Sequence, residues 1–257
     1  MASQLPVVLS PALPSELLSY IVTRHVYPTT LIICCSREEF IEALGHDVQQ
    51  QFTHPRGDSP DQVDEPNRGP REHPQHLLLS APLYQVAIAR HIRMIFVPTV
   101  SHLRGLFSVF SLDDSKVPPP PVDRFPSGDG EWQSRPLPPL LVYGFLDMHR
   151  DTSEWSAQGL GTTAAGLVEA AKRSGFQAVI VDQPTIGVAD VEMDSGQELE
   201  VMLAEEVPLL SGGVRRMAPD TDEGGWTGRT VEVRRVLGRW FHFEGREWNM
   251  QKKGNAD

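Results

Sequence analysis

The densest group of chemically active side chains follows the apolar run at 140–145. Five of them stand within eight positions: Asp147, His149, Asp151, Ser153 and Glu154. An acid, a histidine and a serine are the residue types of a hydrolase, in which the histidine takes the proton of the serine nucleophile. The GxSxG turn that presents such a serine in α/β hydrolases is missing. The stretch DTSE is also typical of a helix start, with Thr152 or Ser153 as the cap. We therefore prefer the helix cap and keep a small α/β hydrolase as an alternative.

Basic and aromatic residues are interleaved near the C-terminus. Nine lysines or arginines lie between Arg215 and Lys253, and Trp226, Trp240 and Trp248 stand among them. Arginines that track phosphates beside rings that stack on bases suit single-stranded DNA. The candidate DNA-binding residues are Arg215, Arg216, Arg229, Arg234, Arg235 and Arg239. A half-buried strand would also place arginines outside and tryptophans inside, so this structural interpretation stays open.

Metal and phosphate chemistry finds little support in the sequence. Histidines gather in a polar segment at 46, 54, 73 and 76, but no HxxxH or CxxC spacing occurs. A phosphate-binding P-loop would need GxxxxGK[ST]. The glycine-rich segment QGLGTTAAG at 158–166 lacks the lysine, and we expect its glycines to allow close helix packing instead. The sequence predicts no metal site and no cofactor.

Composition limits the classes of function. Among 257 residues, 40% are apolar, which is enough for a sizeable core. A net charge of -11 argues against a chain that coats nucleic acid with its whole surface, although a local basic patch remains compatible with it. Cys34 and Cys35 are adjacent and ill placed for a mutual disulfide, which suggests a reducing compartment. With no signal-like start and no run of about 20 apolar residues, we expect a soluble protein without membrane contact.

The elements that must position these residues alternate between strand and helix. Buried apolar runs predict strands near 30–35, 92–97, 140–145 and 178–182. Helical patterns lie between them, with Ser36 and Glu39 forming a capping box and Ser101 capping a later helix. A helix is expected at 14–25, and 184–206 could contain a short one. The alternation from Thr230 to Phe243, with Gly238 at the turn, predicts a hairpin. The fold class is α/β, a mostly parallel sheet with helices on both faces and a C-terminal β-hairpin.

Two polar segments interrupt this pattern. Residues at about 46–75 and 113–136 are rich in proline, glycine and charge, with few apolar anchors. We expect them to be disordered insertions into one domain that spans 1–257.

Four stretches, in their order along the chain, resemble the core of the RecA-type recombinase superfamily with its first strand and P-loop removed. They are TTLIICCSREEFIEAL, ARHIRMIFVPTVSHLRGLFSVF, PLLVYGFLDMHRDTSEWSAQGLGTTAAGLVEAAKRSGFQAVIVD and GRTVEVRRVLGRWFHF, about half of the chain. Laid on that pattern, Gly144 falls at the Walker B aspartate and Arg150 near the arginine that follows it. The resemblance implies a RecA-like pseudo-ATPase that lacks the residues for Mg²⁺ and γ-phosphate and is not an enzyme.

RecA-like proteins without Walker motifs are similar to two groups, the Shu-complex subunits and the ATPase-like Elongator subunits. The basic tail favours the first group. It implies a non-catalytic nuclear subunit of a recombinational DNA-repair complex, a heterodimer with another RecA-like subunit that contacts single-stranded or forked DNA and supports a recombinase. The alternative is a structural subunit of an Elongator-type tRNA-modification complex in the cytoplasm. Because a missing first strand would uncover apolar surface, the N-terminal LPVVLSPALPSELLSY is the expected docking segment.

Overall fold

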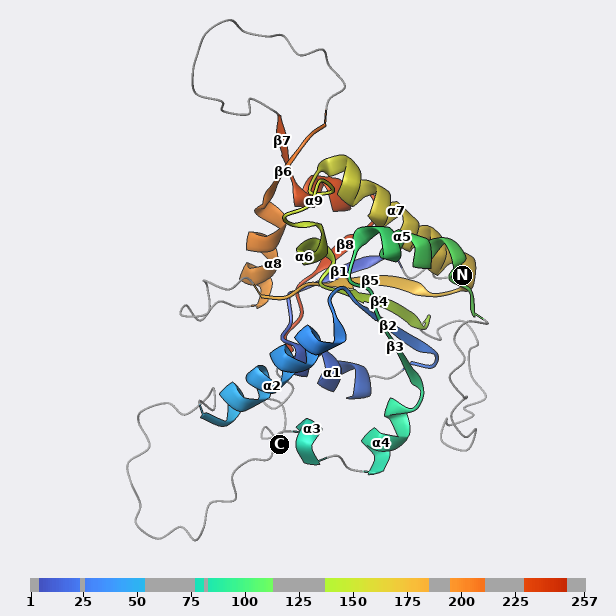
Figure 1. The fold of residues 1–257 in the computed structure, drawn as a ribbon, viewed down its shortest axis with the longest axis vertical. Helices are drawn as coiled ribbons and strands as arrows, with labels where there is room; N and C mark the ends of the chain where they lie inside the picture. Colours follow the sequence, from blue (N-terminus) through green and yellow to red (C-terminus); the bar gives the residue numbers. More distant parts are fainter. Residues whose placement is uncertain are drawn as a thin grey trace, which may run out of the picture.

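A six-stranded parallel sheet forms the centre of the protein (Figure 1). The computed structural model describes residues 5–23, 26–53, 77–80, 83–112, 137–184, 195–210 and 229–248. The strand order is β3-β2-β4-β5-β1-β8. The strands are β1 (Val7–Leu9), β2 (Thr29–Ile33), β3 (Ile92–Phe96), β4 (Pro139–Tyr143), β5 (Gln177–Val181) and β8 (His242–Glu244). The four strands expected near 30–35, 92–97, 140–145 and 178–182 are confirmed.

Helices cover both faces of the sheet (Figure 1). Those between β1 and β3 are α1 (Pro14–Thr23), α2 (Arg37–Thr53), α3 (Leu77–Ser80) and α4 (Leu83–Ala89). Those after β3 are α5 (Val100–Val109), α6 (Phe145–His149), α7 (Ala157–Ser174), α8 (Ser195–Ala204) and α9 (Val233–Leu237). Leu31 and Ile33 pack on one face with Leu17 of α1, whereas Ile32 packs on the other with Leu167 of α7. Alternate residues of each strand therefore serve two separate cores.

An antiparallel pair stands apart from the sheet. It joins β6 (Glu206–Pro208) to β7 (Thr230–Glu232), and Figure 1 shows it beyond α9. The expected α/β class, with a parallel sheet, helices on both faces and a hairpin, is confirmed.

The hairpin includes only the first three residues of the segment that the sequence indicated, Thr230–Glu232. Between Thr230 and Phe243 the chain forms β7, then α9, then β8, which joins the main sheet parallel to β1. Val233, Val236 and Leu237 are all buried, and their i, i+3, i+4 spacing favours a helix over strand alternation. Gly238 ends α9 in right-handed helical geometry (φ −61°, ψ −8°) and is not a hairpin turn.

The N-terminus also corrects an expectation. Val7–Leu9 is an inner strand that pairs with β5 on one side and β8 on the other. An N-terminal strand is thus present in the sheet, and LPVVLSPALPSELLSY is largely buried in the protein's own fold, where Leu17 and Ala12 are fully covered. This strand has only three residues and is flanked by prolines, which is too short to show a period, so the hydrophobic pattern missed it. The prediction that this segment docks on another chain is therefore wrong.

Several boundaries differ in detail. The capping box is confirmed, since Ser36 N donates to Glu39 Oε2 (2.8 Å) and Glu39 N to Ser36 Oγ (3.2 Å). The helix it starts continues to Thr53, so 46–53 is helical where an insertion was expected, and 54–75 lies outside the described residues, as does 113–136. Thr99, not Ser101, caps α5, because its hydroxyl accepts from His102 N. Residues 195–204 form the short helix expected in 184–206.

Among the described helices, none combines the length and apolar character that crossing a membrane requires.

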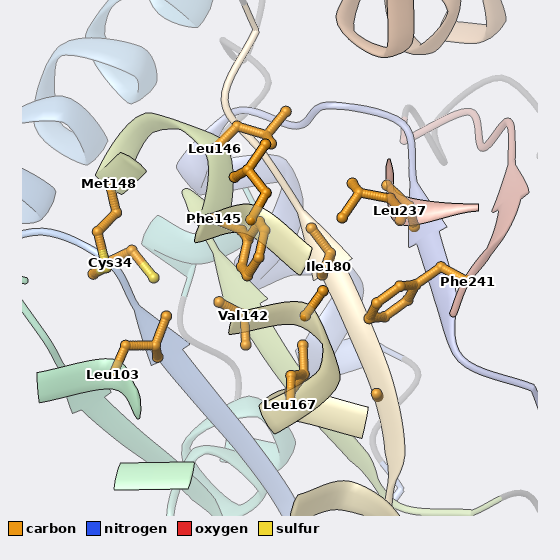
Figure 2. Packing of buried hydrophobic residues seen from close by; sticks show 14 of the residues in the cluster. Cys34, Leu103, Val142, Phe145, Leu146, Met148, Leu167, Ile180, Leu237 and Phe241 are labelled. Carbon is orange, nitrogen blue, oxygen red and sulfur yellow. The ribbon is translucent and has the colours of Figure 1, made fainter. Parts of the chain in front are cut away.

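The main core gathers under α6 and α7. Figure 2 shows Phe145 and Val142 beside Ile180, with Cys34 next to Met148 and with Leu237 and Phe241 entering from the α9 side. Both cysteines are free thiols. The glycines of α7 do allow close packing: a Cβ on Gly159 would stand 2.2 Å from Glu154 O, and one on Gly166 would touch Phe107. The core thus reaches from the sheet to the C-terminal segment and fixes its position.

Candidate functional site

Two regions of the fold could carry function, and the first is the carboxyl edge of the sheet. Neighbouring strands β1 and β5 lead to helices on opposite faces, since α1 packs in one core and α8 in the other. Open α/β sheets bind ligands in the crevice that forms at such a point. The residues there are the loop Ser10–Leu13, Gly144 after β4 and Asp182 after β5.

The loop after β1 uses its polar groups internally. Ala12 N donates to Asp182 O and Leu13 N to Glu16 Oε2, both at 2.9 Å. Pro11 and Pro14 have no N–H to donate. A phosphate cradle needs several free amides that point at one ligand, and this four-residue loop does not offer them.

Aromatic side chains close the same loop from above. The indole Nε1 of Trp248 donates to Pro11 O (2.8 Å), and the hydroxyl of Tyr143 donates to Ala12 O (2.9 Å). Both rings are buried. This part of the carboxyl edge is thus filled by Trp248 of the C-terminal segment and by Tyr143 of β4.

Gly144 turns the chain sharply after β4. Its φ of 78° lies in the left-handed region that favours glycine, and it forms the N-cap of α6 without a side chain. Asp182 supplies the missing cap, because Leu146 N donates to its Oδ1 (2.9 Å). Asp182 is only 2% exposed, and its Oδ2 has no hydrogen-bond partner among the described residues. The Asp182 carboxylate therefore serves as the cap of α6.

The groups around Asp182 are held in their neutral forms. Burial, and the nearby Asp147 charge, raise the pKa of Asp182 to about 8. Burial raises the pKa of Cys34 well above its usual value, and burial together with Glu39 raises the pKa of Cys35 to about 11. A protonated acid and two thiols hold neither Mg²⁺ nor phosphate well.

The hydrolase-like cluster is divided by the fold. Arg150 pairs with Asp147 and, at 2.7 Å, with Glu205. His149 is fully buried, donates from Nδ1 to Phe145 O (2.7 Å) and has Nε2 3.0 Å from Thr163 Oγ1. Burial lowers its pKa. Asp147 and His149 thus have other partners than Ser153.

The same stretch starts α7 at a different cap from the one expected. Thr152 and Ser153 stand before the helix, and Ser156 caps it, since Gly159 N donates to Ser156 Oγ (3.0 Å). Glu154 instead accepts from Arg104 (2.6 Å), which ties α5 to the turn before α7. Thr152 Oγ1 donates to His149 O (2.6 Å), so DTSE is a connecting turn.

The second region is a groove of about 650 Å³ between α8 and β8. Gly196, Leu199 and Glu200 of α8 form one side. The other side runs from Arg234 through Gly238–Phe243 to Gly245, and Leu5 lies at the end. We call this feature the α8–β8 groove. It contains two of the arginines that the sequence singled out, Arg234 and Arg239, and one tryptophan, Trp240.

The candidate arginines differ in their surroundings. Arg229, Arg235 and Arg239 are exposed, and none makes an ion pair with the described residues. Arg234 is half-buried, pairs with Glu200 and lies over the Phe243 ring at 5.5 Å. Arg215 and Arg216 lie outside the described residues. Three of the six candidates therefore present an unpaired guanidinium to solvent.

The tryptophans separate in the same way. Trp248 is buried and has a structural role, which agrees with the interpretation that places the tryptophans inside the fold. Trp240 is 41% exposed at the α8–β8 groove, and Trp226 lies outside the described residues. The sequence did not foresee that α8 would bring Glu200 to these residues. The only signal was the acidic helical stretch itself, and its sequence does not indicate which residues it contacts.

Local charge contrasts with that of the whole chain. Residues 229–248 contain five arginines and three glutamates, a net charge of +2 in a chain of -11. Among the described residues, no group of three or more histidines, cysteines or acids is placed to hold a metal ion.

The chain matches no protein-family model, no curated protein and no solved structure.

Proposed function

We propose that this protein is a non-catalytic, RecA-like subunit of a recombinational DNA-repair complex and that it contacts DNA through its C-terminal segment. The contacts are made by Arg229, Arg235 and Arg239, with Arg215 and Arg216 preceding them in the chain. The observation that carries the proposal is the set of exposed arginines, with no ion pair to any residue that the structure describes, beside an exposed Trp240 in an otherwise acidic protein. Unpaired guanidinium groups gain the most from phosphate, because no ion pair has to be broken first.

The non-catalytic part of the proposal rests on the carboxyl edge of the sheet. The loop Ser10–Leu13 donates its amides within the chain, and Trp248 and Tyr143 cover it. Gly144, which the RecA-type resemblance aligns with the Walker B aspartate, has no side chain to hold Mg²⁺, and burial raises the pKa of Asp182 to about 8. These features support a pseudo-ATPase that needs neither nucleotide nor Mg²⁺ to fold or to bind DNA.

A paralogous partner is supported by the lateral edge of the sheet that β3 forms, on the side opposite β8. β3 pairs only with β2 among the described strands. Since Val97 N donates to Ile33 O, the alternation along the strand turns the backbone groups of Met94 and Phe96 away from β2. Met94 is 42% exposed, and the neighbouring helices expose Leu83 and Val109. An open apolar edge of this kind is a surface for another chain.

The DNA contact can be tested with matched pairs of arginines. We expect Arg235→Ala/Arg239→Ala to weaken single-strand affinity by about tenfold near physiological salt, because two phosphate contacts are lost. The control is Arg37→Ala/Arg90→Ala, which removes the same charge from exposed positions on α2 and after α4. Equal affinities of the two double variants would remove the basis of the proposal.

The setting can be tested by identifying what copurifies with the tagged full chain. Recombinase-paralogue subunits and a recombinase are the expected partners. Elongator subunits would instead place the protein in a tRNA-modification complex, which is the alternative that the sequence left open.

A further inference from the structure

We propose that the α8–β8 groove makes the DNA contact specific for single strands, by receiving one unpaired base against Trp240. This inference rests on the proposed DNA contact and adds the form of nucleic acid that the site selects. Its starting observation is that Trp240 is exposed at a hollow, whereas the neighbouring Phe241 is 4% exposed and belongs to the core.

The groove has the dimensions and the walls for a base. Its volume of about 650 Å³ lies within the range of small-molecule sites. Leu5 and Leu199 supply apolar wall, and Trp240 supplies an aromatic face. In a duplex each base is stacked on its neighbours, so only an unpaired or extruded base offers its face to a tryptophan.

The charge at the groove suits the phosphate that accompanies the base. Arg239 is adjacent to Trp240 in the chain, exposed, and without an ion pair among the described residues. A guanidinium next to a stacked base is the combination that binds single strands without sequence preference. An acidic peptide would also meet Arg239, but it would make no use of the exposed ring.

Glu200 limits the strength of this contact. It holds Arg234 at the groove wall, against the ring of Phe243. A phosphate in the groove has to compete with that carboxylate for Arg234. Neutralising Glu200 therefore frees a second arginine for the strand.

The support under the groove is rigid. Phe241 and Leu237 pack into the main core beside Ile180 (Figure 2). His242 N donates to Pro6 O (2.9 Å), which fixes β8 to the chain just before β1. Trp240 thus stands on an anchored segment, so a base that stacks on it loses little affinity to ordering of the protein.

The experiment compares a short oligothymidine with a hairpin duplex of the same length, using the full chain. Trp240→Leu should lower affinity for the single strand by about tenfold, as expected for one base–aromatic stack, and leave duplex affinity unchanged. Trp240→Phe should retain most of the single-strand affinity, because a phenyl ring still stacks. Circular dichroism and thermal unfolding verify that both variants are folded.

A gain of binding gives an independent readout. Glu200→Gln should raise single-strand affinity about threefold, through the release of Arg234. Glu42→Gln is the matched control, since it removes the same charge from an exposed position on α2 at the other face of the sheet. Equal effects of the two substitutions would overturn the role of Glu200.

The result that overturns the central inference is a Trp240→Leu variant that binds both oligonucleotides as the wild type does. If Arg235→Ala/Arg239→Ala still weakens binding in that case, the DNA contact stands and only the groove assignment fails. If polyglutamate quenches the fluorescence of Trp240 and oligothymidine does not, the groove is a peptide site and the inference is likewise wrong.

Discussion

Single residues decide which chemistry the carboxyl edge of the sheet retains. Asp182 ends β5, caps α6 through Leu146 N and has one oxygen without a partner among the described residues. Burial raises its pKa to about 8, whereas an aspartate in an unfolded chain titrates near pH 4. The folded protein therefore binds a proton that the unfolded chain has released. The contribution of Asp182 to stability is fully present below about pH 4 and is lost as the pH rises to about 8.

The substitution Asp182→Asn tests whether Asp182 is protonated in the folded protein. The amide keeps an acceptor for Leu146 N and cannot ionise. We expect the free energy of unfolding of the variant, minus that of the wild type, to rise between pH 5 and 8 and to level off above pH 8. Urea denaturation at each pH measures it. A difference that does not change with pH would mean that Asp182 is ionised in the folded protein.

Residue types alone indicated part of the candidate site. The sequence identified Arg235, Arg239 and Trp240, which the fold leaves exposed at or near the groove. It did not separate them from Arg234, which Glu200 pairs, or from Trp248, which the core buries. That difference depends on long-range contacts, and one sequence does not contain them.

At the scale of elements, the five-residue strands were predictable, whereas the shortest elements were not. β2 and β4 are continuous buried runs, and such runs identify inner strands of a parallel sheet. β1 and β8 have three residues each and gain their place from neighbouring strands. For α9, arginines on one side and valines on the other fitted strand and helix patterns alike, and burial of Val233 and Leu237 decided for the helix.

Two glycines test how tightly these elements pack. Gly159→Ala would place a Cβ 2.2 Å from the backbone oxygen of Glu154, so we expect a loss of about 1–3 kcal/mol in stability. Gly105→Ala in α5 meets nothing within 4 Å and should gain about 0.5–1 kcal/mol, because alanine favours the helix. Thermal or urea unfolding of both variants provides the comparison. A stabilising Gly159→Ala would contradict the close approach of α7 to the preceding turn.

At the scale of the whole molecule, the two lateral edges of the sheet differ. β8 and the α8–β8 groove stand at one edge, and at the other β3 has no strand beyond it among the described residues. In the proposed assembly, DNA meets the first edge and a paralogous subunit the second. In that arrangement the partner and the DNA use separate surfaces of an acidic protein.

The partner edge has a direct test. Met94→Lys places a charge on the exposed edge of β3 without altering the hydrogen bonds to β2, and edge lysines oppose strand pairing. We expect the tagged variant to lose its partner while its own unfolding temperature stays within a few degrees of the wild type, since surface substitutions cost little. Retention of the partner would move the interface elsewhere.

The central claim is that the C-terminal arginines bind phosphate without help from a nucleotide. Its most direct measurement is the salt dependence of single-strand affinity for the wild type and for Arg235→Ala/Arg239→Ala, each with and without Mg²⁺ and ATP. Each phosphate contact contributes about 0.7 to the slope of log K against log salt. The account predicts that the double substitution reduces the slope by about 1.4 and that ATP changes neither value. An unchanged slope in the double variant, or a slope that depends on ATP, would contradict it.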